Sequence, residues 1–329
     1  ATLAPFNRKI HVLNPKQVNK FKEAYNDLPK NDSVDSFVIA DCLRFGRINK
    51  EVYIGDYHYK ALQNLTRARY FAVCNLVKEK QRFMNVLFKK YSTMTQEKVF
   101  SDTFSTTALA VYDEFESAEA LANMDLHELT AFIMERGKNR FPDPDSVAKA
   151  IQKAARSSYR LPKTVNDSVN QVLSISITSM KALESQIKEF DKAIAAQMKL
   201  LPNVLTSIPG IGPVYAAGIM AEIGDINRFE NHAQLAKYAG LAWTQYQSGS
   251  FEAQTTRLIR SGNRFLKYYL CEAAFSLVRC DKEYSDFYHL KYKEVNRYQH
   301  KRALALTARK LVRLVFALLK DNRLYRPAK

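Results

Sequence analysis

The sequence predicts a mainly α-helical protein, and three observations support this fold class. Only 10 Gly and 10 Pro occur among 329 residues, so residues that form turns are scarce. Hydrophobic residues make up 47% of the chain, which is typical of a globular protein rather than a disordered one. In two segments, 59–92 and 166–201, apolar residues recur near helical spacing, and in the second segment they are three or four residues apart. The length allows two or three domains.

The first segment, residues 1–50, predicts one strand followed by two helices. Residues 8–14 read as a strand, and residues 15–25 read as a helix that begins at Pro15. The second helix covers 31–46, with Asn31 or Asp32 as its cap and Gly46 at its C-terminal end. Because one strand cannot form a stable sheet, we expect this segment to be the C-terminal part of an α/β domain whose other strands come earlier.

The central segment, residues 51–201, predicts a coiled-coil helical hairpin. Its arms are the helices at 59–92 and 166–201, which we expect to pack antiparallel with residues 93–163 as an insert between their ends. Apolar residues of the second arm form an imperfect heptad seam, which suits either an intramolecular core or a dimer interface. Inside the insert, the stretch FPDPDS at 141–146 predicts a helix capped by Asp145 or Ser146.

The last segment, residues 202–329, opens on a helix-hairpin-helix pattern. In LTSIPGIGPVYAAGIMAEIGD (205–225), an apolar helix end precedes Gly210 and Gly212, and an Ala-rich helix follows. Glycines let backbone amides approach a phosphate closely, so these two predict a DNA contact that is independent of base sequence. A plain turn between packed helices is the alternative. Further helices are predicted at 231–242, 261–280, 282–293 and 302–320.

The net charge of +17 predicts an anionic partner. Residues 253–329 hold 18 Lys and Arg against 6 Asp and Glu, an asymmetry that favours nucleic acid over an anionic membrane surface. No apolar run of about 18 residues occurs, so we expect a cytoplasmic protein that does not cross a membrane. The four cysteines form no CxxC pair, which argues against structural zinc and against a disulfide framework.

Two small groups of residues could carry chemistry. Asp32 and Asp35 are spaced i,i+3 on one helix, so their carboxylates share a face and could hold Mg²⁺, although acidic residues also suit a helix N-terminus for dipole reasons. Ser248 precedes Gly249 in the polar stretch TQYQSGSFE (244–252) and is either a turn residue or a nucleophile, with Ser250 as a second candidate. Three basic residues, Arg257, Arg260 and Arg264, follow and could stabilise a phosphate under attack.

Two stretches resemble one known family. KNDSVDSFVIADCLRFGR (30–47) is similar to the Lys-x-Asp-x-x-Asp block of bacterial insertion-sequence transposases that carry a split active site, made of DEDD carboxylates and a serine. The stretch from Leu205 to Leu270 is similar to the C-terminal transposase domain of that family. The order of segments also agrees with the family: a RuvC-like (RNase H-like) domain, a coiled-coil hairpin, and a serine transposase domain with a helix-hairpin-helix element.

This resemblance implies an RNA-guided DNA recombinase. Family members pair donor and target DNA with a structured bridge RNA, assemble as dimers or tetramers, and link a serine covalently to DNA while four carboxylates bind Mg²⁺. Ser248 matches the nucleophile, and Asp32 and Asp35 match the last two carboxylates. The first Asp and the Glu have no match, so we expect an N-terminally truncated, nucleoid-associated transposase. The alternatives are a non-catalytic nucleic-acid-binding remnant and a metal-dependent RuvC-like nuclease that needs no serine.

Overall fold

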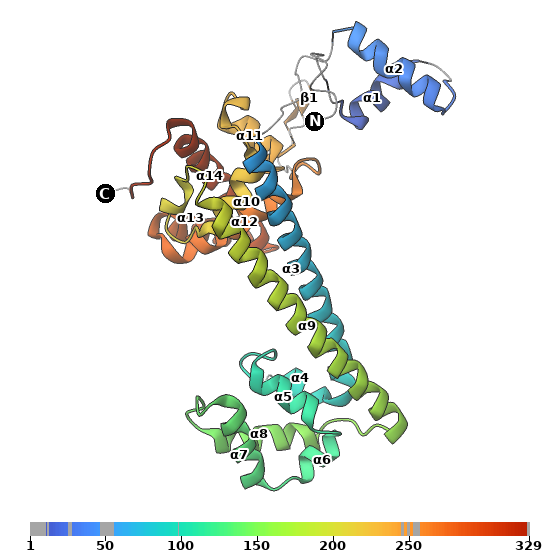
Figure 1. The fold of residues 1–329 in the computed structure, drawn as a ribbon, viewed down its shortest axis with the longest axis vertical. Coiled ribbons are helices and arrows are strands. Elements are labelled where there is room, and N and C mark those ends of the chain that lie inside the picture. Colours follow the sequence, from blue (N-terminus) through green and yellow to red (C-terminus); the bar gives the residue numbers. More distant parts are fainter. Residues whose placement is uncertain are drawn as a thin grey trace. The chain divides into compact units, whose positions relative to one another are not determined.

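The computed structural model describes residues 11, 13–25, 28–46, 56–97, 99–244, 247–248, 251–252 and 257–327. The chain divides into two compact units, Ala1–Tyr57 and His58–Lys329. Helices dominate the described residues of both units, so the mainly α fold class is confirmed (Figure 1). None of the helices in this described part is long and apolar enough to cross a membrane.

The first unit contains two described helices, α1 (Pro15–Lys22) and α2 (Asp32–Arg44). As predicted, Pro15 begins α1, and Asn31 caps α2 by accepting a hydrogen bond from the Val34 amide at 2.8 Å. Gly46 follows α2 with a φ of +64°, a left-handed conformation that glycine adopts without strain. Most of the strand predicted at 8–14 lies outside the described residues, and the RuvC-like remnant stays a prediction.

The second unit contains twelve α-helices, two 3₁₀ turns and two short strands in its described part. In chain order these are α3 (Tyr57–Lys90), α4 (Ser92–Glu97), α5 (Thr106–Glu114), α6 (Ala118–Asn123), α7 (Leu126–Gly137), α8 (Pro144–Arg156), α9 (Lys163–Met198), η2 (Leu205–Ser207), α10 (Pro213–Ile223), η3 (Ile226–Arg228), α11 (His232–Tyr238), β1 (Gln247–Ser248), β2 (Phe251–Glu252), α12 (Arg264–Cys280), α13 (Lys282–Lys293) and α14 (Gln299–Asp321).

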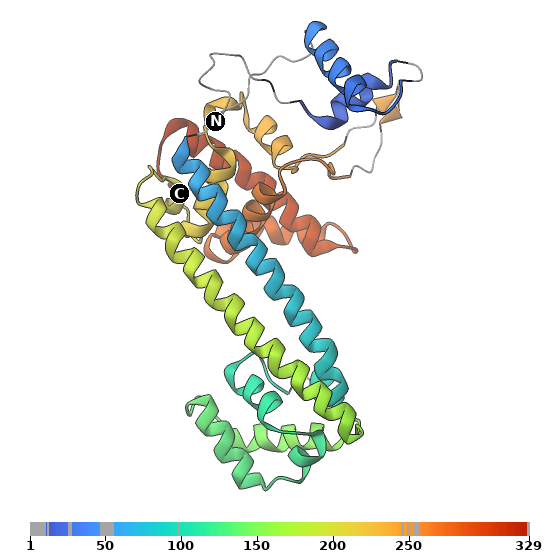
Figure 2. The ribbon, with the colours of Figure 1, turned by 45° about the vertical axis from the view of Figure 1, so that its right-hand side comes forward.

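The two long helices, α3 and α9, run antiparallel and side by side, with α4–α8 between their ends (Figures 1 and 2). Side chains join them along their length: Arg69 pairs with Asp191 at 2.5 Å, and Lys80 pairs with Glu184 at 3.4 Å. Among the apolar residues of the predicted seam in α9, Leu173, Ile177, Met180, Ile194 and Met198 are buried, whereas Leu183, Ile187 and Phe190 of the middle stretch are only partly buried. In the described part of the chain, this middle stretch lies beside α3. The helical hairpin is therefore present, whereas supercoiling and the domain boundaries drawn from the sequence stay predictions.

Two hydrophobic cores lie at the opposite ends of this hairpin. The first, which we call the C-terminal core, joins α10, α11, α12 and α14 with Leu62, Ile194 and Met198 of the long helices. The second, which we call the insert core, joins α5–α8 with Phe83, Leu87 and Leu173. Each long helix thus belongs to both cores and connects them.

Two sequence expectations about helix ends were wrong. The cap of α8 is Asp143, not Asp145 or Ser146; its carboxylate accepts from the Ser146 amide at 3.0 Å, because Pro144 has no N–H to offer and suits the first helical position. The residues before Gly210 form only the 3₁₀ turn η2, where the helix-hairpin-helix pattern called for an α-helix. The second helix of that pattern, α10, is present.

Candidate active site and nucleic-acid interface

Ser248 lies at the end of the first strand of a β-hairpin. Strand β1 pairs antiparallel with β2, so that Gln247 faces Glu252 and Ser248 faces Phe251. This register leaves only residues 249–250 between the two strands, so Ser248 adjoins the tip of the hairpin. Ser250 lies outside the described residues. Ser248 is therefore the last residue of a strand rather than a turn residue, and its role as a nucleophile stays a prediction.

The base of the hairpin is closed by backbone hydrogen bonds. The Thr244 amide donates to the Arg257 carbonyl at 2.8 Å, and the Ile259 amide donates to the Ala242 carbonyl at 2.9 Å. Just below, the Asn263 amide donates to the Tyr238 carbonyl at 2.7 Å. These bonds fix the two ends of the segment that carries Ser248.

Two glycines let the chain ends meet below the hairpin. Gly240 has a φ of +72° and Gly262 a φ of +133°, both in the left-handed region. A Cβ on Gly262 would lie 2.6 Å from the Cα and the N of Gly240, closer than real atoms approach. Both positions therefore need glycine, for conformation and for space.

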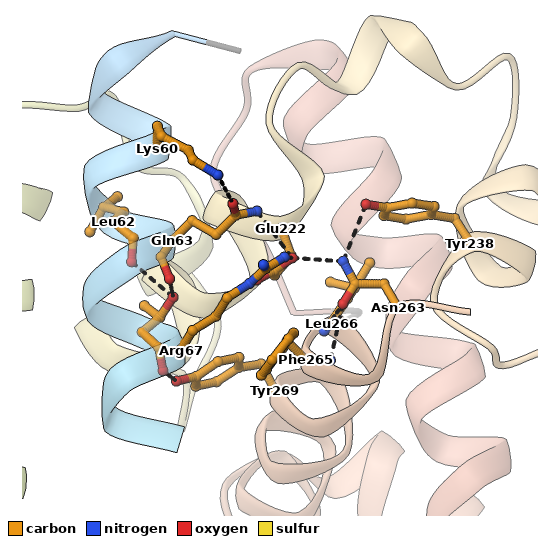
Figure 3. Close-up of polar contacts among 11 residues, drawn as sticks. Lys60, Leu62, Gln63, Arg67, Glu222, Tyr238, Asn263, Phe265, Leu266 and Tyr269 are labelled. Atoms are coloured by element: carbon orange, nitrogen blue, oxygen red, sulfur yellow. Dashed lines mark hydrogen bonds and ion pairs between the residues drawn. The ribbon is translucent and has the colours of Figure 1, made fainter. Parts of the chain in front are cut away.

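A buried carboxylate, Glu222 near the C-terminal end of α10, organises the polar contacts around this base (Figure 3). Arg67 of α3 donates to it twice, from Nε at 2.7 Å and from Nη2 at 2.9 Å, and Gln63 donates at 3.3 Å. The Asn263 side chain donates at 2.6 Å. The hydrogen bond that Arg67 donates to Glu222 is the main reason that the pKa of Arg67 is raised. Such an arrangement supplies a buried charge with the partners that it needs.

Both the oxygen and the nitrogen of the Asn263 side-chain amide make hydrogen bonds. Its Oδ1 accepts from the amides of Phe265 at 3.0 Å and Leu266 at 3.1 Å, which caps α12. Its Nδ2 donates to Glu222 and, at 3.2 Å, to the Tyr238 hydroxyl. One residue therefore joins the start of α12, the end of α10 and the hairpin base.

The three predicted phosphate-binding arginines flank this base. Arg257 and Arg260 come between β2 and α12 in the chain, and Arg264 is the first residue of α12. All three are exposed, and no carboxylate pairs with them among the described residues. The Arg264 guanidinium lies over the ring of Phe265 at 4.8 Å and over that of Phe71 at 5.5 Å. These three cations follow Ser248 in the chain and could bind the oxygens of a phosphodiester.

The predicted aspartates lie in the first turn of α2. Asp32 is exposed, whereas Asp35 accepts a hydrogen bond from the Lys22 ammonium of α1 at 2.7 Å. The buried Asp41 accepts from Arg44 at 2.7 Å and from the Tyr25 hydroxyl, which gives it a structural role. No set of three or more metal-ligating side chains occurs among the residues that the structure describes. Two carboxylates still suit Mg²⁺, which proteins often bind through one or two carboxylates together with water and substrate phosphates.

The two glycines of the predicted helix-hairpin-helix differ in environment. Gly210 has a φ of +80°, and its carbonyl accepts from Ser276 of α12 at 2.7 Å. A Cβ there would lie 3.0 Å from the Cys280 sulfur, so packing explains this glycine. Gly212 precedes α10, is exposed, and would have open space around a Cβ. Gly212 is the more exposed of the two, and the DNA contacts predicted for both glycines stay predictions.

Comparison with known proteins adds the family. A family model described as "Transposase IS116/IS110/IS902 family" matches residues 203–289, and a second model, described as a transposase and named for DEDD transposases of the IS110 kind, matches residues 1–91. These matches cover both the α2 aspartates and the Ser248 hairpin. The chain belongs to the IS116/IS110/IS902 transposase family.

Curated relatives agree with this transposase assignment. The chain is 27% identical over its whole length to the 44.8 kDa protein of insertion element IS116 from Streptomyces clavuligerus and covers 80% of that protein. It is 24% identical to the 42 kDa protein of insertion element IS900 from Mycobacterium paratuberculosis, of which it covers 81%. Over 48% of the chain it is 29% identical to the transposase of IS1111A from Coxiella burnetii, of which it covers 44%. It is an insertion-sequence transposase, an enzyme that acts on DNA.

Sequence reasoning missed the polar network that supports the transposase hairpin. Glu222 is the one charged residue in the apolar helix α10, and that isolation was a usable signal, because a buried charge needs partners. Its partners Arg67 and Asn263 are 155 and 41 residues away in the chain. No local pattern predicts such pairings.

Proposed function

We propose that this transposase cuts and rejoins DNA with Ser248 as the nucleophile. The observation that carries the proposal is the position of Ser248 at the end of β1, in a hairpin whose base is held by Asn263 and flanked by arginines that pair with no carboxylate in the described part of the chain. A nucleophile held on an anchored hairpin can be presented to a phosphodiester while the cations bind its charged oxygens.

In the proposed step, the Ser248 Oγ attacks the phosphorus of one DNA strand. A bond forms between Oγ and phosphorus, and the bond from phosphorus to the 3′ oxygen breaks, which leaves a 5′-phosphoserine and a 3′ hydroxyl. The serine proton passes to water, and the departing 3′ oxygen takes a proton in turn. Attack of another strand's 3′ hydroxyl on the phosphoserine reverses these changes and frees the serine, so the strands are rejoined without an external energy source.

Asp32 and Asp35 are the residues that would hold Mg²⁺ in this proposal. A bound Mg²⁺ stabilises negative charge on phosphate oxygens. The Lys22 ammonium lies 2.7 Å from Oδ1 of Asp35 and would compete with a metal for that oxygen. In line with the family resemblance, we further propose that a structured bridge RNA directs the transposase and that it works as a dimer or tetramer, in which the aspartates of one chain act at the serine of another.

The test is capture of the covalent protein–DNA intermediate. The chain is expressed in cells that carry its own insertion element, and adducts are separated on denaturing gels after nuclease trimming. We expect an adduct with the parent chain and with Ser250→Ala, and a loss of at least about 10³-fold with Ser248→Ala, since removal of a nucleophile abolishes the covalent route. Asp32→Asn should also lower the yield. An adduct that persists in Ser248→Ala would assign the nucleophile to another residue.

A second candidate function, nucleic-acid binding without cleavage, is favoured by the Lys22–Asp35 ion pair, which neutralises one of the two matched carboxylates. The same experiment separates the candidates. DNA binding with no adduct from the parent chain would favour this second function.

A further inference from the structure

Helix α14 carries a stripe of cations on one face. Arg302, Arg309, Arg313 and Lys320 are separated by seven, four and seven residues, which brings them to the same side of a 3.6-residue helix. The two end members have partners: Arg302 pairs with Glu294 at 2.8 Å, and Lys320 donates to the Asn227 side chain at 2.7 Å. The two middle members, Arg309 and Arg313, pair with no carboxylate among the described residues.

Arg309 is partly buried, and its contact is with a histidine of the facing helix α11. Its Nη1 lies 3.3 Å from Nδ1 of His232. Since a guanidinium can only donate, Nδ1 accepts, and the His232 ring is the neutral tautomer with its proton on Nε2. Half-burying an arginine against a neutral histidine leaves a positive charge without compensation.

The charged groups around this pair are of both signs, with arginines on α14 and η3 and one carboxylate beside α11. On α14, Arg309 and Arg313 face His232, and on the side of α11 the Glu230 carboxylate accepts from Gln234 at 2.6 Å. Arg228 of η3 lies over the rings of Phe229 and Tyr238. Burial, followed by Arg309 and Arg313, lowers the pKa of His232, and burial, followed by Arg313, lowers the pKa of Arg309. Because the charge of Arg313 contributes to lowering the pKa of both His232 and Arg309, an anion that binds beside these groups would favour their charged forms.

We propose that Arg309, Arg313 and His232 form a binding site for one backbone phosphate of a nucleic acid. Two guanidinium groups one turn apart on a helix present forked donors to phosphate oxygens, and the Nε2–H group of the neutral His232 ring beside them is a third donor. The site reads no bases, because a phosphate carries no sequence information. This inference rests on the proposed function only in taking nucleic acid as the partner.

The test compares charge removals on the same helix. Binding of the full chain to a labelled duplex of about 30 base pairs, three helical turns, is measured by fluorescence anisotropy over a range of salt, with DNA and RNA duplexes as separate arms. Arg309→Gln and Arg313→Gln should each weaken binding about fivefold near 0.15 M salt and lower the slope of log K against log salt by about 0.9, the value of one phosphate contact.

Lys310→Gln is the matched control. Lys310 lies on α14 next to Arg309, but its ammonium already pairs with Glu283 at 2.7 Å. Removing it takes away the same formal charge from the same helix, and we expect less than about a twofold change in affinity, since the charge is compensated within the protein. Because Arg313 is exposed, its replacement should not impair folding, whereas replacement of the partly buried Arg309 could do so.

A second readout is the titration of His232, followed by NMR with the exposed His127 of the insert as internal reference. Binding of a phosphate should raise the His232 pKa, because an anion favours the charged ring. Loss of affinity in only the DNA arm or only the RNA arm identifies which backbone occupies the site. If the parent chain binds neither duplex, the proposed function itself fails. If it binds and both arginine variants match Lys310→Gln, or the His232 pKa does not move, this site alone is overturned.

Discussion

At the residue scale, the buried charged side chains Glu222 and Lys90 are stabilised by different kinds of partner. Glu222 is compensated by Arg67, whereas Lys90 pairs with no carboxylate among the residues that the structure describes. Lys90 is 1% exposed, donates to the Tyr112 carbonyl at 2.9 Å and lies over the Tyr91 ring at 5.1 Å. Burial lowers its pKa to about 8. The contribution of Lys90 to the free energy of unfolding therefore depends on pH.

Lys90 should make the insert more stable as the pH rises from 8 to about 10. In this window the unfolded chain, with a lysine pKa near 10.4, keeps a proton that the folded chain has lost, so unfolding becomes less favourable with rising pH. We expect the free energy of unfolding of the parent, relative to Lys90→Met, to increase by about 2 kcal/mol between pH 7.5 and pH 10. Chemical denaturation at several pH values measures it. Tyr91 and Tyr112, whose pKa values burial raises, titrate in both proteins and cancel. A difference that stays flat would contradict the expectation.

At the scale of elements, the hairpin that carries Ser248 depends on helices far away in the chain. Asn263 caps α12 and also binds Glu222 of α10, which is held by Arg67 of α3. The short strands of the hairpin cannot be stable alone, because so small a ribbon is marginal in water. Its position is set by the helices that hold its two ends.

Asn263→Ala should therefore loosen the hairpin base. It removes a helix cap, worth about 1 kcal/mol, and one hydrogen bond to a buried carboxylate, worth about another 1–3 kcal/mol. We expect faster hydrogen exchange at the amides of Thr244 and Ile259, measured by NMR or mass spectrometry. Asp125→Ala is the control: Asp125 caps α7 in the same manner, accepting from His127 at 2.8 Å, and binds no buried charge. Equal effects of both variants on Thr244 and Ile259 would refute the coupling.

At the scale of the whole molecule, two separate hydrophobic cores share two helices. The C-terminal core and the insert core are joined through α3 and α9, whose middle stretch is linked by ion pairs such as Arg69–Asp191. Cooperative unfolding requires shared buried contacts, and here the shared contacts are few. A truncated side chain in one core should therefore destabilise that core and leave the other unchanged.

Leu129→Ala tests this independence. Leu129 is fully buried in the insert core, so its truncation should cost about 2–5 kcal/mol. Hydrogen exchange should accelerate in α5–α8 and remain unchanged in α10, α12 and α14. Leu270→Ala, in the C-terminal core and 1% exposed, should give the reverse pattern. If hydrogen exchange accelerates in both cores in each variant, the second unit unfolds as one cooperative unit.

Local sequence signals accounted for most helices of the described chain. Pro15, Asn31 and Gly46 marked ends correctly because caps and left-handed positions depend on neighbouring residues only. At α8 the prediction of Asp145 or Ser146 as the cap was wrong. Pro144 occupies the first helical position, so the residue before it, Asp143, caps the helix. The Ser248 nucleophile, the magnesium aspartates and RNA guidance came from the family resemblance and stay predictions.

The sequence by itself determined the mainly α class, the two long helices, the basic C-terminal region and the transposase family. These follow from periodicity, composition and motif order, which are properties of neighbouring residues along the chain. Only the tertiary structure decided that Glu222 holds Arg67 and Asn263 together, that packing explains Gly210, and that Arg309 faces His232. The physical reason is that desolvation and charge compensation depend on which distant segments pack together.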